Sequence, residues 1–563
     1  MKNFLRLVFT IPVIACLLAA EAAAAGNVVD DTDAVRELVR SGATQLALRR
    51  IDALQPADSA APGWVEWQRL RLQLLADSGG HEELLRRISA LPPQLSQAQR
   101  TEFYLLAAQS ALMLGRFAEA RDHAGRALWA DGIDPVRVRA IRLLVIRSHV
   151  REGKASDAYR SMLRFQQDYR PLEKPVATWF VDGLLDLGLV KEAVNWLGLL
   201  DERGATKLRL RLHTGLIPPQ EVMAQVRKVL AKDTDPQWWR VLLDAALRQQ
   251  DAASVIEARE RLLNHEEAAD ITASGLWESY IDFARRNANA YQLLSGDEQS
   301  WLDFALRRRS ETPVVTRAYL AYLARESAAE SMRKRAQDEL AAMFAMSGLS
   351  RTALRVFNAW PGNASVLPVN ARHVLGDLAL KLGDQPRALD YLGGAPAPID
   401  VPLLAWDVRL AALALQAGSG GIAAEMSMKI AAGKPQIGQP LLPAWIALAR
   451  RLVDHGLPDA ALALFEGALS LAGPAQMRGL LSGIALAHES RSQPLLAADY
   501  HLRSASLAAV PDEAAAESRL RAGLALARAG LREDARAQFE WLLKHSKNQL
   551  HIDAARRELG RPG

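Results

Sequence analysis

A glycine followed five residues later by an alanine recurs along this chain at a nearly constant interval. The pairs are Gly42/Ala47, Gly115/Ala120, Gly153/Ala158, Gly188/Ala193, Gly348/Ala353, Gly383/Ala388, Gly418/Ala423, Gly456/Ala461 and Gly530/Ala535. Neighbouring pairs stand 35 to 38 residues apart wherever the period can be read, and weaker units near Gly79 and Ser492 fill two of the gaps. Such a period is typical of stacked structural units rather than of one compact core.

Each unit predicts two helices joined by a short turn. The glycine ends the first helix, where a positive φ is often needed and only glycine adopts it cheaply. The alanine lies in the second helix, where its methyl group lets the two helices approach closely, and apolar residues then follow at helical spacing. Seven residues before the glycine, a small residue recurs that we expect to face the second helix, at Ala108, Ala341, Gly376, Ala411, Ala449 and Gly523.

The composition agrees with an all-α fold. The 563 residues exceed what one compact domain holds, so the chain needs several domains or one elongated array. Half of the residues are hydrophobic but only 6% are aromatic, and alanine, leucine and arginine recur throughout. Val, Ile and Thr never gather into the alternating runs that half-buried strands require.

This arrangement resembles the tetratricopeptide repeat, a helix-turn-helix unit of about 34 residues with small residues where its helices cross. The resemblance is clearest around Tyr104, Ala108, Gly115 and Ala120, and again from Trp445 to Pro474 and from Gly523 to Leu542. It covers roughly residues 30–215 and 336–545, although Ile146 and Val181 replace the small first-helix residue. The resemblance implies a right-handed superhelical solenoid.

We expect four segments along the chain. Residues 1–25 are predicted to be a signal peptide, 26–235 an N-terminal repeat array, 236–335 a divergent helical segment, and 336–563 a C-terminal repeat array. In the divergent segment the period fades, and Ser295-Gly296-Asp297 and Glu311-Thr312-Pro313 interrupt it. Degenerate repeats and an insertion both fit this segment.

The first residues predict export. Lys2 and Arg6 precede an apolar run from Leu7 to Ala20, and Ala23-Ala24-Ala25 offers the small residues that a signal peptidase reads. Cleavage between Ala25 and Gly26 would place the protein in a periplasm.

Lipidation is the alternative to simple secretion. Val13-Ile14-Ala15-Cys16 resembles a bacterial lipobox, which would make the protein an outer-membrane lipoprotein anchored through Cys16. Apolar residues continue past this cysteine, which favours cleavage after Ala25. Cys16 is the chain's one cysteine, so the mature chain would hold no disulfide and no thiolate metal site.

The sequence predicts neither catalysis nor a cofactor or metal. It contains no HExxH, Walker or GxSxG motif. His373 and Asp377, four residues apart, favour a surface hydrogen bond over a metal site, which usually needs more protein ligands. The net charge of +5 is small and spread along the chain, whereas nucleic-acid binding needs clustered basic residues with aromatics.

The resemblance implies a concave surface lined by first helices, across which peptides lie. By register this surface includes Arg147, Arg151, Asp182, Asp186, His373, Asp377, Lys381, Arg450, Asp454 and Arg528. Their mixed charges suit recognition of specific protein side chains. An ordinary solvated helix face is the alternative for any one of them.

Together these features predict a non-enzymatic envelope scaffold or adaptor, monomeric by itself, that binds other proteins. Similar repeats occur in exopolysaccharide secretion and in cell-wall assembly, and the sequence does not choose between them. The alternative is a glycan-binding or catalytic site within residues 236–335, suggested by Trp277, Glu278, Tyr280, Asp282, Trp301 and Asp303. Trp277, Tyr280 and Ile281 also have core spacing.

Overall fold

A computed structural model describes residues 44–129, 134–265, 271–287, 297–359, 364–433, 435–507 and 512–560, with Thr32, Val35, Arg36 and Val39. The structure is 77% helical, with 29 α-helices and no strand in these residues. The prediction of an all-α array of helix-turn-helix units is confirmed. Cys16, Ala25, Gly26 and Gly42 lie outside the described residues.

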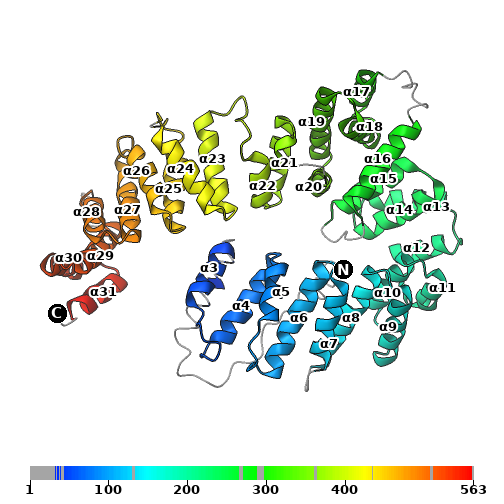
Figure 1. Cartoon of the computed structure of the whole chain (residues 1–563), viewed down its shortest axis with the longest axis horizontal. Coiled ribbons are helices and arrows are strands. Elements are labelled where there is room, and N and C mark those ends of the chain that lie inside the picture. The colour runs from blue at the N-terminus through cyan, green and yellow to red at the C-terminus, as the bar shows by residue number, and fades with distance from the viewer. Residues whose placement is uncertain are drawn as a thin grey trace. The chain divides into compact units, whose positions relative to one another are not determined.

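The chain divides into two compact units, and the boundary follows Leu262, inside the predicted divergent segment. Figure 1 shows the helices of the first unit side by side in chain order. They are α3 (Thr44–Leu54), α4 (Trp64–Asp77), α5 (His81–Ser89), α6 (Gln97–Met113), α7 (Phe117–Leu128), α8 (Pro135–Arg151), α9 (Ala155–Asp168), α10 (Lys174–Asp186), α11 (Val190–Ala193), η1 (Val194–Leu199), α12 (Ala205–His213), α13 (Pro219–Leu230), α14 (Pro236–Gln249) and α15 (Ala252–Leu263).

The second unit continues the same arrangement (Figure 1). Its helices are α16 (Ala273–Asn287), α17 (Glu298–Arg307), α18 (Pro313–Glu326), α19 (Glu330–Met346), α20 (Ser350–Asn358), η3 (Ala364–Val366), α21 (Val369–Lys381), α22 (Gln385–Leu392), α23 (Leu403–Gln416), α24 (Gly420–Ala432), α25 (Leu442–Asp454), α26 (Pro458–Leu469), α27 (Pro474–Ser490), α28 (Pro494–Ser506), α29 (Glu513–Arg528), α30 (Arg532–His545) and α31 (Gln549–Leu559).

The turn between the two helices of a pair has the geometry that the glycine pattern predicts. At Gly115, φ is +73°, and the N–H of the next residue, Arg116, donates to the carbonyl of Ala111 at 2.9 Å. This bond closes the end of the first helix as in a Schellman motif. The same left-handed turn and backbone bond occur at Gly79, Gly153, Gly188, Gly215, Gly348, Gly383, Gly418, Gly456 and Gly530.

Two turns use a residue other than glycine. Gln250 and Ser492 have φ of +58° and +57°, and each ends the first helix of a pair. Ser492 is the turn of a weaker unit that the sequence indicates. The turns at Gly215 and Gln250 have the same geometry, although they lie where the glycine–alanine period of the sequence fades.

The predicted small residues lie where the helices of a pair approach most closely. Ala120, Ala158 and Ala461 are completely buried in their second helices. A β-carbon built on Gly376 would lie 2.4 Å from Cγ of Leu392, and one on Gly523 would lie 2.7 Å from Cε1 of Phe539. The small first-helix residue therefore makes room for a large side chain of the second helix, as the pattern predicts.

Asn264, just after α15, caps a helix far along the chain. Its Oδ1 accepts hydrogen bonds from the backbone N–H of Arg351 at 3.0 Å and of Thr352 at 3.3 Å. Its Nδ2 donates to the carbonyl of Gly348 at 3.3 Å. These bonds satisfy backbone N–H groups in the first turn of α20. The side chain of that helix's own N-cap residue makes no such bond.

Among the described residues, no helix combines the length and the apolar character that crossing a membrane requires.

Candidate partner-binding surface

The predicted binding residues lie on the first helices of five pairs. Most occupy the positions six and two residues before the left-handed turn, a set of side chains that we call the first-helix face. Arg147 and Arg151 belong to α8, Asp182 and Asp186 to α10, His373, Asp377 and Lys381 to α21, Arg450 and Asp454 to α25, and Arg528 to α29. His373 lies one turn earlier on α21 than the face.

In the first unit this face carries charges of alternating sign. At the position six residues before the turn, successive first helices present Arg147, Asp182, Arg209 and Asp244. Opposite charges on neighbouring helices attract one another more strongly where water is excluded. The structure joins the last three of these residues into one cluster.

Arg209 is the centre of that cluster, and its side chain is only 6% exposed. Its Nε donates to Oδ2 of Asp244 at 2.6 Å, and its Nη2 donates to Oδ1 of Asp186 at 2.6 Å. The third carboxylate, of Asp182, lies 3.5 Å from Nη1 and accepts a further hydrogen bond from Thr206 at 2.8 Å. The guanidinium group of α12 thus ties together α10, α12 and α14.

The pKa values of Arg209, Asp244 and Asp182 agree with the distances between the guanidinium group and the carboxylates. Burial would lower the pKa of Arg209, but the three carboxylates outweigh it and raise that pKa. Burial would likewise raise the pKa of Asp244, yet the bonds from His213 and Arg209 lower it. For Asp182, which has the longest contact to Arg209, burial prevails and raises the pKa. Asp182 and Asp186 therefore have intramolecular partners.

The two predicted basic residues of α8 also contact their own chain. The guanidinium of Arg147 lies 5.5 Å from the ring centre of Trp179, a cation–π contact with the next repeat. Nη1 of Arg151 donates to the carbonyl of Leu112 at 3.4 Å. The sequence named these residues but could not show that neighbouring repeats contact them.

His373 and Asp377 of the second unit have separate partners. Nε2 of His373 lies 2.9 Å from the carbonyl oxygen of Pro396, and its ring contacts Trp406 edge-on. Asp377 pairs with Arg409 of the next first helix at 3.1 Å, with both side chains about half exposed. Each of these residues is bonded outside its own helix.

Four predicted residues of the second unit are exposed, and their side chains make no hydrogen bond or ion pair in the described part of the chain: Lys381, Arg450, Asp454 and Arg528. Arg450 lies directly over α27, where a β-carbon on Gly479 would come within 2.2 Å of its Nη2. Half-buried apolar side chains of the same face, Leu486 and Leu524, belong to the next two first helices. This face thus offers charged groups beside apolar ones.

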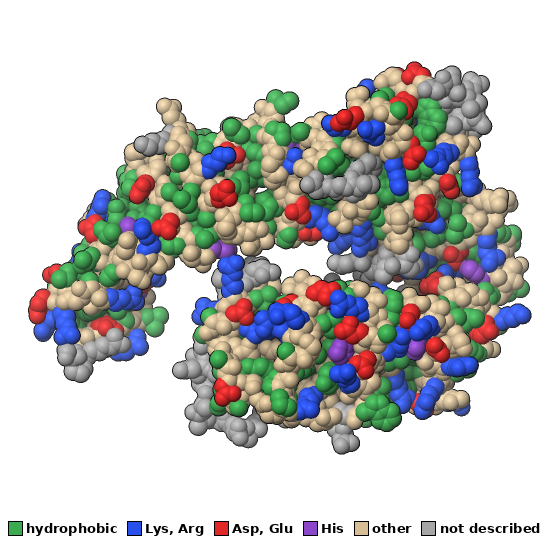
Figure 2. All heavy atoms as spheres, viewed as in Figure 1, with side chains coloured by type: hydrophobic (Ala, Val, Ile, Leu, Met, Phe, Trp, Pro, Cys, Tyr) green, Lys and Arg blue, Asp and Glu red, His purple; other side chains and the backbone are tan. Residues whose placement is uncertain are grey.

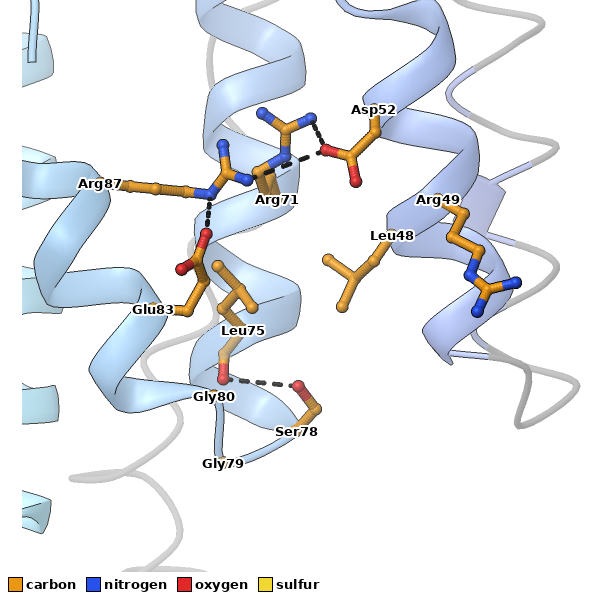
Figure 3. A pocket seen from close by; sticks show the side chains of 10 residues that line it. All are labelled: Leu48, Arg49, Asp52, Arg71, Leu75, Ser78, Gly79, Gly80, Glu83 and Arg87. Atoms are coloured by element: carbon orange, nitrogen blue, oxygen red, sulfur yellow. Dashed lines mark hydrogen bonds and ion pairs between the residues drawn. The ribbon is translucent and has the colours of Figure 1, made fainter. Parts of the chain in front are cut away.

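A hollow in the first unit, of about 380 Å³, lies between α3, α4 and the start of α5. Figure 3 shows Arg71 and Arg87 converging on the Asp52 carboxylate, while Arg49 extends away from it. Nε of Arg87 also donates to Glu83 at 2.6 Å. The buried Arg71 has a lowered pKa because of its burial and the neighbouring Arg87 charge. These charges compensate one another within the hollow.

The described residues contain no group of three or more His, Cys, Asp or Glu side chains that could hold a metal ion. Basic and acidic side chains are interspersed on the face that Figure 2 shows.

In the alternative site within residues 236–335, Trp277 and Tyr280 are buried. Trp277 donates from Nε1 to the carbonyl of Val356 at 3.1 Å. The ring of Trp301 stacks on that of Tyr322 and meets Tyr319 edge-on. These aromatic side chains pack within the protein, and for Trp277 and Tyr280 the helical spacing indicates this.

Comparison with known proteins gives structural matches only, because no family model and no curated protein matches the sequence. The first is a chain of the APC/C hetero-tetramer Cut9-Hcn1, at 12% identity and a TM-score of 0.26, covering 93% of this chain and 95% of that one. The structure of Naa15/Naa10 bound to HypK-THB matches at 14% identity and a TM-score of 0.24, covering 94% of this chain and 80% of that one. Yeast Tom70 matches at 12% identity and a TM-score of 0.23, covering 82% of this chain and 96% of that one.

Proteins containing tetratricopeptide repeats are thus among the matches. Because these identities and TM-scores are low, the fold is assigned from the helices of this chain itself. The protein is an all-helical array whose pairs have the period, the left-handed turn and the small-residue contact of the tetratricopeptide repeat.

Proposed function

We propose that this protein is a non-enzymatic scaffold that binds other proteins through the first-helix face of its second unit. The observation that carries the proposal is the exposure of Lys381, Arg450 and Asp454 without an intramolecular partner, on a face that also carries the exposed Arg528. An exposed charged group on a rigid helix can pair with a protein side chain without first breaking an internal contact.

The contrast between the two units supports this choice of surface. In the first unit the corresponding charges are joined to one another around Arg209, so a partner would have to separate buried ion pairs. In the second unit, Ala412, Leu486 and Leu524 occupy the same register and are half-buried. Their exposed apolar area, beside charged groups, suits a peptide segment that is both charged and apolar.

Export to the cell envelope belongs to the proposal and rests on the residues before Gly26. The basic start, the apolar run and the small residues at Ala23 to Ala25 support it. Mass spectrometry of the protein from a periplasmic fraction tests this part. A mature chain that begins at Gly26 supports secretion, one that begins at an acylated Cys16 supports an outer-membrane lipoprotein, and an unprocessed chain in the cytoplasm overturns both. The proposal includes a role in exopolysaccharide secretion or in cell-wall assembly.

The binding test uses the full-length protein, tagged and crosslinked in its native cell. The variant Arg450→Glu/Asp454→Arg reverses the two charges that α25 contributes to the first-helix face. Its matched control, Asp499→Arg/Arg503→Glu, reverses a pair with the same four-residue spacing on α28, the second helix of a pair, where both side chains are more than half exposed.

A protein partner recovered with the wild type and with the control, but not with the α25 variant, supports the proposal. Equal recovery with both variants overturns the assignment of the face. Retention of glycan or a small molecule without any protein partner overturns the scaffold function. Circular dichroism of both variants checks that their helices are intact.

A further inference from the structure

His213 lies at the edge of the Arg209 cluster, between two charged side chains of α14. Its Nε2 is 2.6 Å from Oδ2 of Asp244, and its Nδ1 is 3.2 Å from Nη2 of Arg248. A guanidinium group has donors only, so Nδ1 accepts this hydrogen bond and carries no proton. His213 is therefore neutral in this arrangement, and its one ring proton is donated from Nε2 to Asp244.

Charged groups surround this histidine on three helices. Asp244 and Arg248 of α14 contact it directly, and Arg209, one turn earlier on α12, bonds the same oxygen of Asp244. Beyond Arg209 lie Asp182 and Asp186 of α10, and Arg240 of α14 pairs with Asp186 at 3.6 Å. No described charged group of α13 bonds to this cluster. With His213 neutral, the three carboxylates balance Arg209, Arg240 and Arg248.

A second proton on the ring would occupy Nδ1 and face the Arg248 guanidinium. The donor of Arg248 would then meet another donor, and the two positive charges would repel each other. The other bond of Arg248 is a 3.3 Å contact from Nη1 to the carbonyl of Leu212, and its side chain is exposed. Arg248 can therefore leave the cluster, whereas Arg209 is held by three carboxylates.

We propose that His213 and Arg248 form a pH-sensitive switch on the first-helix face of the first unit. Protonation of His213 strengthens its bond to Asp244 and releases the Arg248 side chain into solvent, where it adds an unpaired positive charge to that face. This inference rests on contacts of the first unit and is independent of the proposed binding surface of the second.

The test measures the reactivity of individual arginines in the full-length protein. An arginine-selective dicarbonyl reagent is applied at a series of pH values between about 7.5 and 5.5, and modification at each site is quantified by mass spectrometry. The extent of modification at Arg248 is divided by that at Arg450. This ratio cancels the intrinsic pH dependence of the reagent, because the Arg450 side chain is exposed and has no polar partner among the described residues. We expect this ratio to rise several-fold as the pH falls, along a one-proton curve.

The control variant is His213→Gln, whose amide can donate to Asp244 and accept from Arg248 but does not titrate. Its ratio should stay at the high-pH value throughout. A flat ratio in the wild type, or an equal rise in His213→Gln, overturns the switch. If the variant does not fold, the wild-type ratio of Arg227 to Arg450 serves instead. Arg227 pairs with Glu257 and not with a histidine, so this ratio should not change, and a rise parallel to that of Arg248 overturns the switch.

Discussion

Nε of Arg209 lies 2.6 Å from Oδ2 of Asp244, although these residues belong to different repeats and stand 35 positions apart. The same guanidinium reaches Asp182 and Asp186 of the preceding repeat. One buried cation therefore connects three successive first helices of the first unit.

Replacing this cation should loosen all three helices. Arg209→Met keeps most of the side-chain volume but leaves three carboxylates without their shared counter-charge, and the loss of one partner from a buried ion pair typically costs about 3–5 kcal/mol. Amide hydrogen exchange in α10, α12 and α14 measures the free energy of local opening. Arg116→Met is the matched control, because the Arg116–Glu82 pair is exposed and should contribute less than about 1 kcal/mol. Equal effects of the two substitutions would contradict the central role of Arg209.

Gln250 should be replaceable by glycine with a gain in stability. Its φ of +58° is unfavourable for a residue with a β-carbon, and its side chain is exposed. Relief of that strain, about 1–2 kcal/mol, exceeds the entropy that glycine loses on folding, so we expect a net gain of up to about 1 kcal/mol. Urea unfolding of Gln250→Gly measures it. Gln249→Gly, one residue earlier and still within α14, should instead destabilise the protein by about 1 kcal/mol.

The converse change, from glycine to alanine, tests the same kind of turn at a position where the new side chain makes no contacts. Gly456 has a φ of +71°, and a β-carbon there would meet nothing within 4 Å. Gly456→Ala should therefore cost about 1–2 kcal/mol through the backbone alone. The measurement is the urea midpoint of the second unit. An unchanged midpoint would mean that the turn tolerates a side chain and that glycine is not required there.

Gly376 should not tolerate even a methyl group. The added β-carbon would lie 2.4 Å from Cγ and 2.5 Å from Cδ2 of Leu392, so Gly376→Ala should cost about 1–3 kcal/mol through overpacking. Gly125→Ala in α7 is the matched control, because nothing lies within 4 Å of its β-carbon, and it should stabilise the helix by about 0.5–1 kcal/mol. Thermal unfolding should give shifts of opposite sign. Shifts of the same sign would argue against close contact of α21 and α22.

The second unit should lose stability in acid partly through Glu489. Burial alone would raise the pKa of this carboxyl, but the hydrogen bond from the fully buried His501 and the charges of Arg521 and Arg528 lower it overall. A carboxylate with a lowered pKa stabilises the folded state above its unfolded pKa of about 4.3, and that contribution is lost as the pH falls through the lower folded value. Unfolding midpoints between about pH 5 and pH 3 should fall more steeply for the wild type than for Glu489→Gln. Parallel curves would show that Glu489 does not couple to folding.

Much of the repeat could be predicted from the sequence because its determinants are local. The Gly115 turn is closed by a backbone bond between Arg116 and Ala111, five residues apart, and the buried Ala120 follows five residues after the glycine. Residue size and backbone freedom at a fixed spacing are visible in a sequence. The same reasoning missed the turns at Gly215 and Gln250, because neither is followed by an alanine five residues later. The residue at that distance from Gln250 is Val255.

The partners of the charged residues were decided by the tertiary structure. The sequence by itself determined that Asp182, Asp186, Arg450 and Asp454 lie on first helices, because their distance from the turn fixes their register. It could not determine that the first two are joined to Arg209 while the last two stay unpaired. Long charged side chains can each reach several helices, so their pairing depends on how neighbouring repeats stack. The bonds of Asn264 to Arg351 and Thr352 have the same origin, because only the folded chain brings residues nearly 90 positions apart together.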